Sequence, residues 1–399
     1  MIKKRIGILT GGGDCAGLNP AVKWVVKTAT DEAIKRKTKI EFECYGILDG
    51  WRGLVEADTR VGADLSRTII PLNAGIVRTW DREGGTRLGT SRTNPYNPKN
   101  NTSKKVLENI KRLGLDYVVG IGGEDTLGVA YKLYKDGIDT VGIPKTIDND
   151  LNSTDYSLGF QTAVNVIAEE VRRLRTTAGS HKRIFVVETM GRHAGWLALE
   201  GGRGAGAYII LIPEHDYSVD QVIRLLKERE AKGIRYSIVV VSEGAKAKGE
   251  EETVIHGKTD SFGHKALGGV GEFLAGKLRD RGGFETRHVV LSHLQRGGAP
   301  SAWDVCMGRD FGIAAVDLIV NKLFGHMVSY KNGRITHVPL KDAVLDLKTV
   351  NVRELYDTER YNARRFGIIK PVKTGKKAAK PKSGRTAKSG QTAKKTKKK

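Results

Sequence analysis

The sequence predicts an α/β protein with two Rossmann-like domains, each built from a mainly parallel sheet with helices on both faces (a three-layer αβα arrangement). Three observations predict this class. Short runs rich in β-branched residues alternate with longer amphipathic stretches. Glycine-rich segments follow several of the short runs. The length of 399 residues is sufficient for two domains of ordinary size.

The predicted strands are short and end beside glycine or polar residues. They cover Arg5–Leu9, Asp116–Ile121, Asp139–Ile143, Ile184–Glu188, Ala207–Ile212, Tyr236–Val241 and His288–Leu291. The predicted helices have one apolar face and cover Asn19–Lys37, Ser103–Leu113, Asp125–Lys135, Gln161–Leu174, Val219–Lys232 and Val270–Arg281. Strands that alternate with helices form βαβ units, whose parallel sheets bind ligands beyond the carboxyl ends of the strands.

The net charge of +23 is unevenly distributed. Residues 371–399 include eleven lysines, one arginine and no acidic residue, so this segment carries about half of that charge. Its lysine, alanine, threonine, serine and glycine residues cannot bury enough apolar surface to fold. We expect a solvated, disordered tail; salt-sensitive adhesion to nucleic acid is the open alternative, and no stacking aromatic residues support it.

The cysteines and the N-terminus indicate a cytoplasmic protein without a membrane partner. Cys15, Cys44 and Cys306 are too few and too scattered for a disulfide framework or a metal cage, which indicates a reducing compartment. The apolar patch near the N-terminus runs directly into glycines and is better explained as a first strand than as a signal peptide.

Three glycine-rich junctions follow predicted strands. They are Gly11–Gly17, Gly84–Arg92 and Gly122–Thr126. Glycines allow backbone N–H groups to approach an anion at a helix N-terminus. The first junction lacks the Lys-Ser/Thr of a P-loop and does not fit the spacing of a dinucleotide-binding fingerprint, so both of those nucleotide sites are excluded.

Acidic residues mark two of the strand ends. Glu124 and Asp125 stand where a phosphate-binding loop would be expected to present donors, and a Mg²⁺ ligand explains such an acid. Favourable first-turn acids of a helix are the alternative. Asp148 and Asp150 follow the strand that ends at Ile143, beside Lys145, and this set offers a general base and a cation for a transferred phosphoryl group.

These motifs, in this order, resemble those of the phosphofructokinase family from Lys4 to about Phe366. The matching segments are Gly12–Asp14, Gly84–Arg92, Gly122–Thr126, Thr146–Asp150, Met190–Arg192, Glu243 and His293–Gly298. The resemblance implies a phosphofructokinase-type fold and phosphoryl transfer to the 1-hydroxyl of fructose 6-phosphate, which gives fructose 1,6-bisphosphate. It also implies a Mg²⁺ cofactor and a homo-oligomer, with dimer and tetramer both open.

The resemblance also implies a role for each matching residue. Asp148 corresponds to the base that takes the proton of the sugar hydroxyl, with Lys145 and Asp125 as further catalytic residues and Glu124 as the metal ligand. The residues implied at fructose 6-phosphate are Thr146, Ile147, Asp150, Met190, Gly191, Arg192, Glu243, His293 and Arg296, together with Arg183 and Arg287 from a neighbouring subunit. The residues implied at the donor phosphates are Gly12, Gly13, Arg92 and Gly123.

The identity of the donor depends on Asp125 and Lys145. In the family, ATP-using members generally have glycine at the position of Asp125, whereas this chain resembles the pyrophosphate-using and mixed branch. A carboxylate there would lie in the path of the α-phosphate of ATP, and two like charges about 4 Å apart repel by roughly 4 kcal/mol at an effective dielectric of about 20. We therefore expect pyrophosphate as the donor, with an ATP-dependent 6-phosphofructokinase as the alternative.

Two other classes of protein explain these motifs less well. Lipid and NAD kinases share a similar glycine loop, but the Met190–Arg192 and His293–Gly298 motifs suit a sugar phosphate. A non-catalytic polyanion-binding protein does not explain Asp148 and the arginines. We expect residues 1–150 to bind the donor and Mg²⁺, 151–300 to bind the sugar phosphate, 301–370 to form C-terminal helices that return to the first domain, and 371–399 to be the tail.

Overall fold

The structure is a computed structural model that describes residues 2–249, 254–259 and 265–367. Residues 1–364 form one compact unit, and the remainder is a second unit that consists mostly of the predicted tail, which lies outside the described residues. The division of the first 370 residues into separate functional domains stays a prediction. Within the described ranges, no helix combines the length and the apolar character needed to cross a bilayer.

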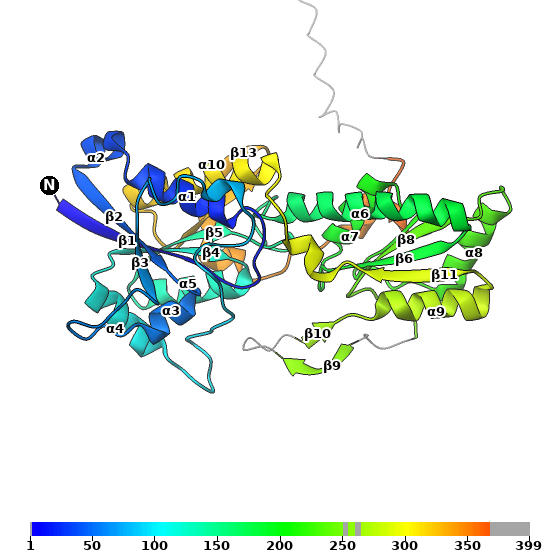
Figure 1. Cartoon of the computed structure of the whole chain (residues 1–399), viewed down its shortest axis with the longest axis horizontal. Helices are drawn as coiled ribbons and strands as arrows, with labels where there is room; N and C mark the ends of the chain where they lie inside the picture. The colour runs from blue at the N-terminus through cyan, green and yellow to red at the C-terminus, as the bar shows by residue number, and fades with distance from the viewer. Residues whose placement is uncertain (1, 250–253, 260–264, 368–399) are drawn as a thin grey trace, which may run out of the picture. The chain divides into compact units, whose positions relative to one another are not determined.

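A seven-stranded sheet occupies the N-terminal half of the chain and also includes two late strands (Figure 1). In spatial order its strands are β13 (Arg334–Pro339), β12 (His326–Lys331), β5 (Asp139–Pro144), β4 (Tyr117–Gly122), β1 (Ile2–Thr10), β2 (Ile40–Ile47) and β3 (Ile69–Leu72). The five central strands are parallel, and the two edge strands are antiparallel. The prediction of a mainly parallel sheet is confirmed.

Helices cover both faces of this sheet (Figure 1). One face carries α1 (Leu18–Ala29) and α10 (Ala302–Val320), and the other carries α3 (Trp51–Glu56), α4 (Ser103–Leu113) and α5 (Glu124–Lys135). Val118 packs into one core and Val119 into the other, because successive strand side chains point to opposite faces. Continuous apolar runs in the strands therefore reflect burial on both sides.

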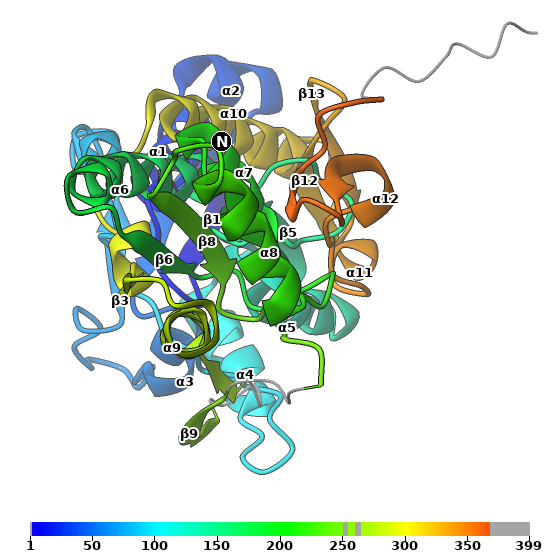
Figure 2. The same cartoon turned by 90° about the vertical axis from the view of Figure 1, so that its right-hand side faces the viewer.

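A second, four-stranded sheet is entirely parallel. Its strands, in spatial order, are β11 (Thr286–Val290), β6 (Ile184–Thr189), β8 (Ser237–Ser242) and β7 (Ile209–Leu211). Figure 2 shows α6 (Phe160–His181) on one face and α9 (Val270–Gly282) on the other; α7 (Trp196–Ala205) packs with α6, and α8 (Val219–Glu230) packs with α9. The predicted three-layer αβα class is thus confirmed here as well.

The remaining elements are short. They are α2 (Glu32–Thr38), α11 (Leu340–Ala343), α12 (Val352–Leu355), the 3₁₀ turns η1 (Trp80–Arg82) and η2 (Ser292–Arg296), and the strand pairs β9 (Val254–Thr259) with β10 (Lys265–Leu267) and β14 (Tyr356–Asp357) with β15 (Asn362–Ala363).

Some predicted boundaries were wrong. The single helix predicted over Asn19–Lys37 is two helices, because the side chain of Asp31 accepts a hydrogen bond from Ala33 N at 2.7 Å and caps a new helix. The helix predicted over Gln161–Leu174 continues to His181. The strand predicted over Ala207–Ile212 is only Ile209–Leu211.

A buried carboxylate on α10 joins that helix to the start of α6. Asp304 is completely buried and accepts hydrogen bonds from the hydroxyl of Tyr156 (2.5 Å), the backbone N–H of Gly159 (2.7 Å), and both the N–H and the hydroxyl of Thr162 (2.8 and 2.5 Å). These bonds satisfy N–H groups that the first turn of α6 leaves without an intrahelical partner. Asp304 therefore fixes the start of α6 next to the acid-bearing turn at 145–155.

We expect Asp304→Ala to lower the free energy of unfolding by about 3 kcal/mol or more, because several buried donors would lose a charged acceptor. Urea denaturation followed by circular dichroism measures this change. Asp317→Ala, on an exposed part of the same helix, is the matched control and should change stability by less than about 0.5 kcal/mol. Equal effects of the two substitutions would contradict the assignment.

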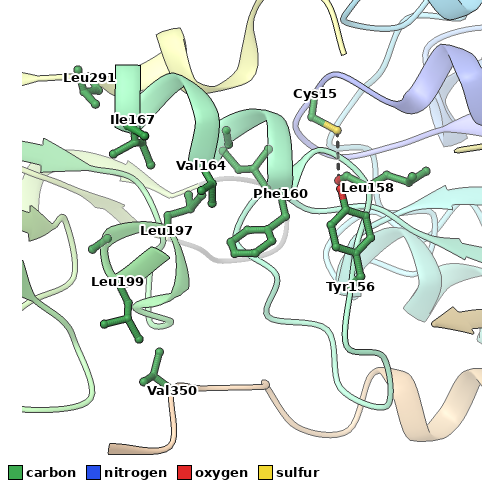
Figure 3. Close-up of a cluster of buried hydrophobic side chains, with 14 of the residues drawn as sticks. Cys15, Tyr156, Leu158, Phe160, Val164, Ile167, Leu197, Leu199, Leu291 and Val350 are labelled. Carbon is green, nitrogen blue, oxygen red and sulfur yellow. Dashed lines mark hydrogen bonds between the residues drawn. The ribbon is translucent and has the colours of Figure 1, made fainter. Parts of the chain in front are cut away.

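The hydrophobic core reaches the first glycine loop. Figure 3 shows Cys15, which lies within that loop, with its thiol directed at the carbonyl oxygen of Leu158, close to the buried residues Tyr156 and Phe160; the sulfur–oxygen distance is 3.5 Å. Burial raises the pKa of the Cys15 thiol to about 12, so this cysteine is an inert packing residue. The core thereby fixes the position of the loop.

Candidate active site

Three loops meet at the carboxyl ends of adjacent parallel strands. Thr10 of β1 pairs with Ile121 of β4, and Gly122 of β4 pairs with Pro144 of β5, so the chain leaves all three strands at one edge of the sheet. Hydrogen bonds from Gly11 N to Ile121 O (3.0 Å) and from Lys145 N to Gly122 O (3.0 Å) hold the loops together. This edge is where ligands bind in parallel α/β sheets.

A pocket at this edge collects residues from both halves of the chain. Its lining consists of Gly12, Gly13, Asp14, Arg92, Gly123, Glu124, Asp125, Thr126, Lys145, Thr146, Ile147, Asp148, Asp150, Arg192, His193, Arg296 and Leu347. Thirteen of the predicted site residues are among them: Gly12, Gly13, Arg92, Gly123, Glu124, Asp125, Lys145, Thr146, Ile147, Asp148, Asp150, Arg192 and Arg296.

Two glycines of the first glycine loop disfavour a side chain for different reasons, Gly12 by its backbone conformation and Gly13 by its closeness to a neighbour. Gly12 has a φ of +79°, and its N–H donates to the carbonyl oxygen of Ser91 at 3.1 Å. A Cβ atom on Gly13 would overlap a terminal guanidinium nitrogen of Arg296. Glycine at these two positions therefore lets an arginine from the second half of the chain lie directly over the backbone of the loop.

Two cations line the pocket at this loop. The ammonium of Lys145 donates to the carbonyl oxygen of Gly13, and burial lowers the pKa of this lysine. The buried Nε of Arg296 finds no hydrogen-bond acceptor among the described residues. A buried guanidinium N–H without an acceptor indicates that an anionic ligand completes its hydrogen bonding.

Asp148 has the environment of a general base. Its side chain is 9% exposed, and its Oδ1 has no hydrogen-bond donor among the described residues. Burial, followed by the negative charges of Asp150 and Glu243, raises the pKa of Asp148 to about 7, although Arg296 and Arg192 oppose the shift. A carboxylate that titrates near neutral pH and lines a pocket is suited to accept a proton there.

The turn that carries Asp148 is held by its own side chains. Asn149 adopts a left-handed conformation (φ +52°), and its Oδ1 accepts hydrogen bonds from the N–H (3.1 Å) and the hydroxyl (3.2 Å) of Ser157. Its Nδ2 donates to the carbonyl oxygen of Asp155 at 3.3 Å. The middle residue of the Asp-Asn-Asp sequence therefore has a structural role, and the flanking carboxylates point to the pocket.

The N-terminus of α5 opens into the pocket without a side-chain cap. Gly123 is the N-cap residue, and Glu124 and Asp125 form the first turn. Uncapped N–H groups and the positive end of the helix dipole favour a phosphate at this position. Asp125 and its neighbour Glu124 also line an adjoining cavity, together with Asn94, Gly128, Val129, Tyr131, Lys132 and Val344, so both acids border the two spaces.

Four residues of the predicted sugar-phosphate set lie behind the lining. Glu243 accepts a hydrogen bond from the N–H of Arg192 at 3.1 Å, and Met190 N donates to Oε1 of Gln295 at 3.3 Å. Gly191 precedes Arg192, and His293 lies in η2 together with Arg296. These residues adjoin the arginines of the pocket without lining it in this chain.

Arg183 and Arg287 lie elsewhere. Arg183 precedes β6 and Arg287 is near the start of β11, whereas the pocket lies beyond the opposite ends of the strands. Both arginines form ion pairs with Glu285, at 2.6 and 3.4 Å. The structure of one chain does not bring them to the pocket, and their service to a neighbouring subunit stays a prediction.

Four lining residues were not predicted as site residues: Asp14, Thr126, His193 and Leu347. Asp14 and Thr126 lie within the matching motifs, and His193 directly follows the Met190–Arg192 motif, so the sequence contained a signal for all three. Leu347 had no signal in the sequence, because it reaches the pocket through a backbone bridge to Leu151.

The sequence matches a family model described as Phosphofructokinase over residues 5–319. The chain belongs to the phosphofructokinase family. The family resemblance inferred from the motifs is therefore confirmed.

Individual phosphofructokinases support the same assignment. The pyrophosphate–fructose 6-phosphate 1-phosphotransferase of Amycolatopsis methanolica is 46% identical over 87% of this chain and 96% of its own length. ATP-dependent 6-phosphofructokinase 3 of Streptomyces coelicolor is 41% identical over 87% of this chain and 96% of its own length. The crystal structure of a pyrophosphate-dependent phosphofructokinase from Marinobacter aquaeolei has a TM-score of 0.73 at 23% identity, with 91% of this chain and 89% of the other covered, and this likeness concerns the fold.

Phosphofructokinases use a divalent metal, and the pocket contains carboxylates of the kind that bind one. No cluster of three or more His, Cys, Asp or Glu side chains suited to a metal occurs in the described part of the chain. Mg²⁺ does not need such a cluster, because it binds through one or two carboxylates, water and substrate phosphates. The carboxylate of Glu124, which lines the pocket, is an oxygen ligand of the required kind.

The raised pKa of Asp148 predicts a pH dependence. Only the ionised form of a base accepts a proton, so kcat/KM should fall about tenfold per pH unit below an apparent pKa near 7. Asp150→Asn removes the largest neighbouring negative charge and should move this acidic limb to lower pH. Substrate phosphates also titrate in this range, but their titration would be the same in both proteins. An unshifted limb in Asp150→Asn would contradict the assignment of the limb to Asp148.

Proposed function

We propose that this chain is a pyrophosphate-dependent phosphofructokinase, which transfers a phosphoryl group from pyrophosphate to the 1-hydroxyl of fructose 6-phosphate. The products are fructose 1,6-bisphosphate and phosphate. The reaction is reversible because pyrophosphate, a phosphoanhydride, and the 1-phosphate ester of fructose 1,6-bisphosphate have similar free energies of phosphoryl transfer. The observation that carries the donor assignment is the position of Asp125 between the main pocket and the adjoining cavity.

The carboxylate of Asp125 discriminates between the donors by charge. A nucleotide that filled the main pocket with its terminal phosphates would have to pass Asp125 to place the rest of the molecule in the adjoining cavity. Repulsion of roughly 4 kcal/mol corresponds to about a thousandfold weaker binding. Pyrophosphate has no α-phosphate or nucleoside, so it does not need the adjoining cavity on the other side of Asp125. The 46% identical relative that carries the pyrophosphate-dependent name supports the same donor.

The residues of the pocket have complementary tasks in this reaction. Asp148 removes the proton from the 1-hydroxyl of the sugar as that oxygen attacks the terminal phosphorus of the donor. Arg192 and Arg296 hold phosphate oxygens through guanidinium N–H groups, which match them bidentately. Lys145, the N–H groups of the glycine loop and the open N-terminus of α5 offset the charge that spreads over the transferred group.

Mg²⁺, held by Glu124 and phosphate oxygens, would supply further neutralisation of that charge. The pocket is lined by both acids and cations. The carboxylates can therefore bind the metal while the cationic side chains bind the phosphates. We propose Mg²⁺ as the specific divalent ion because it prefers this combination of a few carboxylates and phosphate oxygens.

A homo-oligomer is part of the proposal. Arg183 and Arg287 lie at the opposite end of their sheet from the pocket, and each is partly exposed. They can serve a phosphate site only in a neighbouring copy of the chain. We also propose the cytoplasm as the location and expect neither a membrane nor a nucleic acid as a partner; the possible exception for nucleic acid is the tail.

Product analysis tests the proposal. Purified protein supplied with fructose 6-phosphate, pyrophosphate and Mg²⁺ should yield fructose 1,6-bisphosphate and phosphate in equal amounts, as observed by ³¹P NMR. The reverse mixture should regenerate pyrophosphate without any nucleotide. Formation of fructose 1,6-bisphosphate only after ATP is added would establish the ATP-dependent alternative, to which the 41% identical Streptomyces relative belongs by name.

A further inference from the structure

A C-terminal segment, residues 346–350, crosses the acid-bearing turn. Leu347 forms an isolated antiparallel bridge with Leu151 and lines the pocket. The next N–H, that of Lys348, donates to the carbonyl oxygen of Asp150 at 2.7 Å. The segment therefore binds the backbone two residues after Asp148, although it lies beyond residue 319, where the match to the family ends.

The side chain of Lys348 binds the same turn at two further points. Its ammonium donates to the carbonyl oxygens of Thr154 at 2.8 Å and Asp155 at 3.2 Å. The carbonyl of Asp155 also accepts from Asn149, the residue next to Asp148. The side chains of Lys348 and Asn149 thus both donate to the carbonyl oxygen of Asp155 and stabilise the turn together.

The segment is anchored on its other side to the second sheet's helices. Nε1 of Trp196, the first residue of α7, donates to the carbonyl oxygen of Lys348 at 2.8 Å, and the ammonium lies 5.7 Å from the centre of the same indole. Val350 N donates to Glu214 at 2.7 Å, and that carboxylate also accepts from Gly195 N at 2.9 Å. Figure 3 shows the side chain of Val350 near Leu199 of α7.

We propose that Lys348 is a positioning residue that holds the turn bearing Asp148 against α7 during phosphoryl transfer. The inference rests on the proposed function, because it assigns a task to that turn. Its physical basis is that a displacement of about 1 Å in a reacting group costs on the order of a hundredfold in rate. Loss of the two side-chain hydrogen bonds to this turn would allow such a displacement without removing any group that binds the sugar phosphate.

Because the Lys348 side chain is charged, its contribution to turnover should depend on pH. Burial lowers the pKa of Lys348 to about 8, while the charges of Asp155 and Asp150 oppose this shift. The ammonium of Lys348 has three N–H donors, two of which bind the carbonyl oxygens of Thr154 and Asp155. Deprotonation of the ammonium weakens these hydrogen bonds. Turnover of the wild-type enzyme should therefore decline above about pH 8, the range in which Lys348 loses its proton.

The test compares Lys348→Met and Lys348→Arg with the wild type, and uses Lys341→Met, an exposed lysine of α11, as the matched control. We expect kcat of Lys348→Met to fall at least about tenfold, with KM for fructose 6-phosphate changed less than about threefold. Lys348→Arg should restore most of the turnover and move the alkaline limb upward by more than one pH unit, because arginine remains charged throughout this range. Lys341→Met should match the wild type.

Each other outcome contradicts the inference. A kcat of Lys348→Met equal to that of the control, or a proportional loss of kcat and rise of KM with a lower melting temperature, would indicate a structural role alone. If Lys348→Met does not fold, an unchanged alkaline limb in Lys348→Arg overturns the inference. The measurements use whichever of pyrophosphate and ATP supports activity, so a wrong donor would not affect them. A wild-type enzyme inactive with both donors would overturn the proposed function and this inference together.

Discussion

Asp148→Asn should reduce kcat by about a hundredfold to ten-thousandfold, the range by which a positioned general base accelerates proton transfer. Asparagine keeps the shape of the side chain but cannot accept the proton of the attacking hydroxyl. Since Arg192 and Arg296 remain in place, KM for fructose 6-phosphate should change little. Steady-state kinetics at saturating donor measures both quantities.

Stability measurements separate this loss from a loss of structure. Asp148 is buried and its charged form is disfavoured there, so the neutral asparagine should unfold at no lower temperature than the wild type. Asp346→Asn is the control and should retain full activity, because Asp346 is exposed and does not line the pocket, although it precedes the lining residue Leu347. An Asp148→Asn enzyme with more than a tenth of the wild-type kcat would contradict the role of Asp148 as base.

Asp125→Gly should change the preference between the two donors by about a thousandfold in favour of ATP. The substitution removes the negative charge between the main pocket and the adjoining cavity, so the efficiency with ATP should rise. The efficiency with pyrophosphate should fall, because the family resemblance implies a catalytic role for Asp125 in the pocket that it lines. The ratio of kcat/KM for the two donors is the quantity to measure.

Asp125→Asn distinguishes charge from space in this comparison. Asparagine has nearly the same volume as aspartate, so an effect of charge should appear in Asp125→Asn almost as strongly as in Asp125→Gly. Improvement in the glycine variant alone would mean that bulk excludes the nucleotide. An unchanged ratio in both variants would remove Asp125 from the explanation of donor choice.

The sequence allowed the fold class and most of the pocket to be predicted because both depend on local patterns. In a parallel sheet, every strand ends at the same edge, so motifs that directly follow strands are brought together by topology alone. Gly12, Gly123 and Asp148 come from three such ends and line one pocket. The adjacency of β1, β4 and β5 made this local reasoning sufficient.

Features that depend on distant contacts could not be predicted in this way. Asp304 looks like an ordinary helical acid in the sequence, and the four hydrogen bonds that it accepts from Tyr156, Gly159 and Thr162 depend on how α10 packs against the start of α6. Lys348 is surrounded by no motif, and its partners lie nearly 200 residues earlier in the chain. The break at Asp31 was missed because the apolar pattern continues across it, whereas the cap is a single side-chain bond.

The most direct test of the account is the ratio of kcat/KM for pyrophosphate to that for ATP, measured on the purified wild-type protein with fructose 6-phosphate and Mg²⁺ at one ionic strength. Exclusion of the nucleotide by the carboxylate at Asp125 predicts a ratio of about a thousand. A ratio below one would contradict the account and assign the chain to the ATP-dependent members of the family.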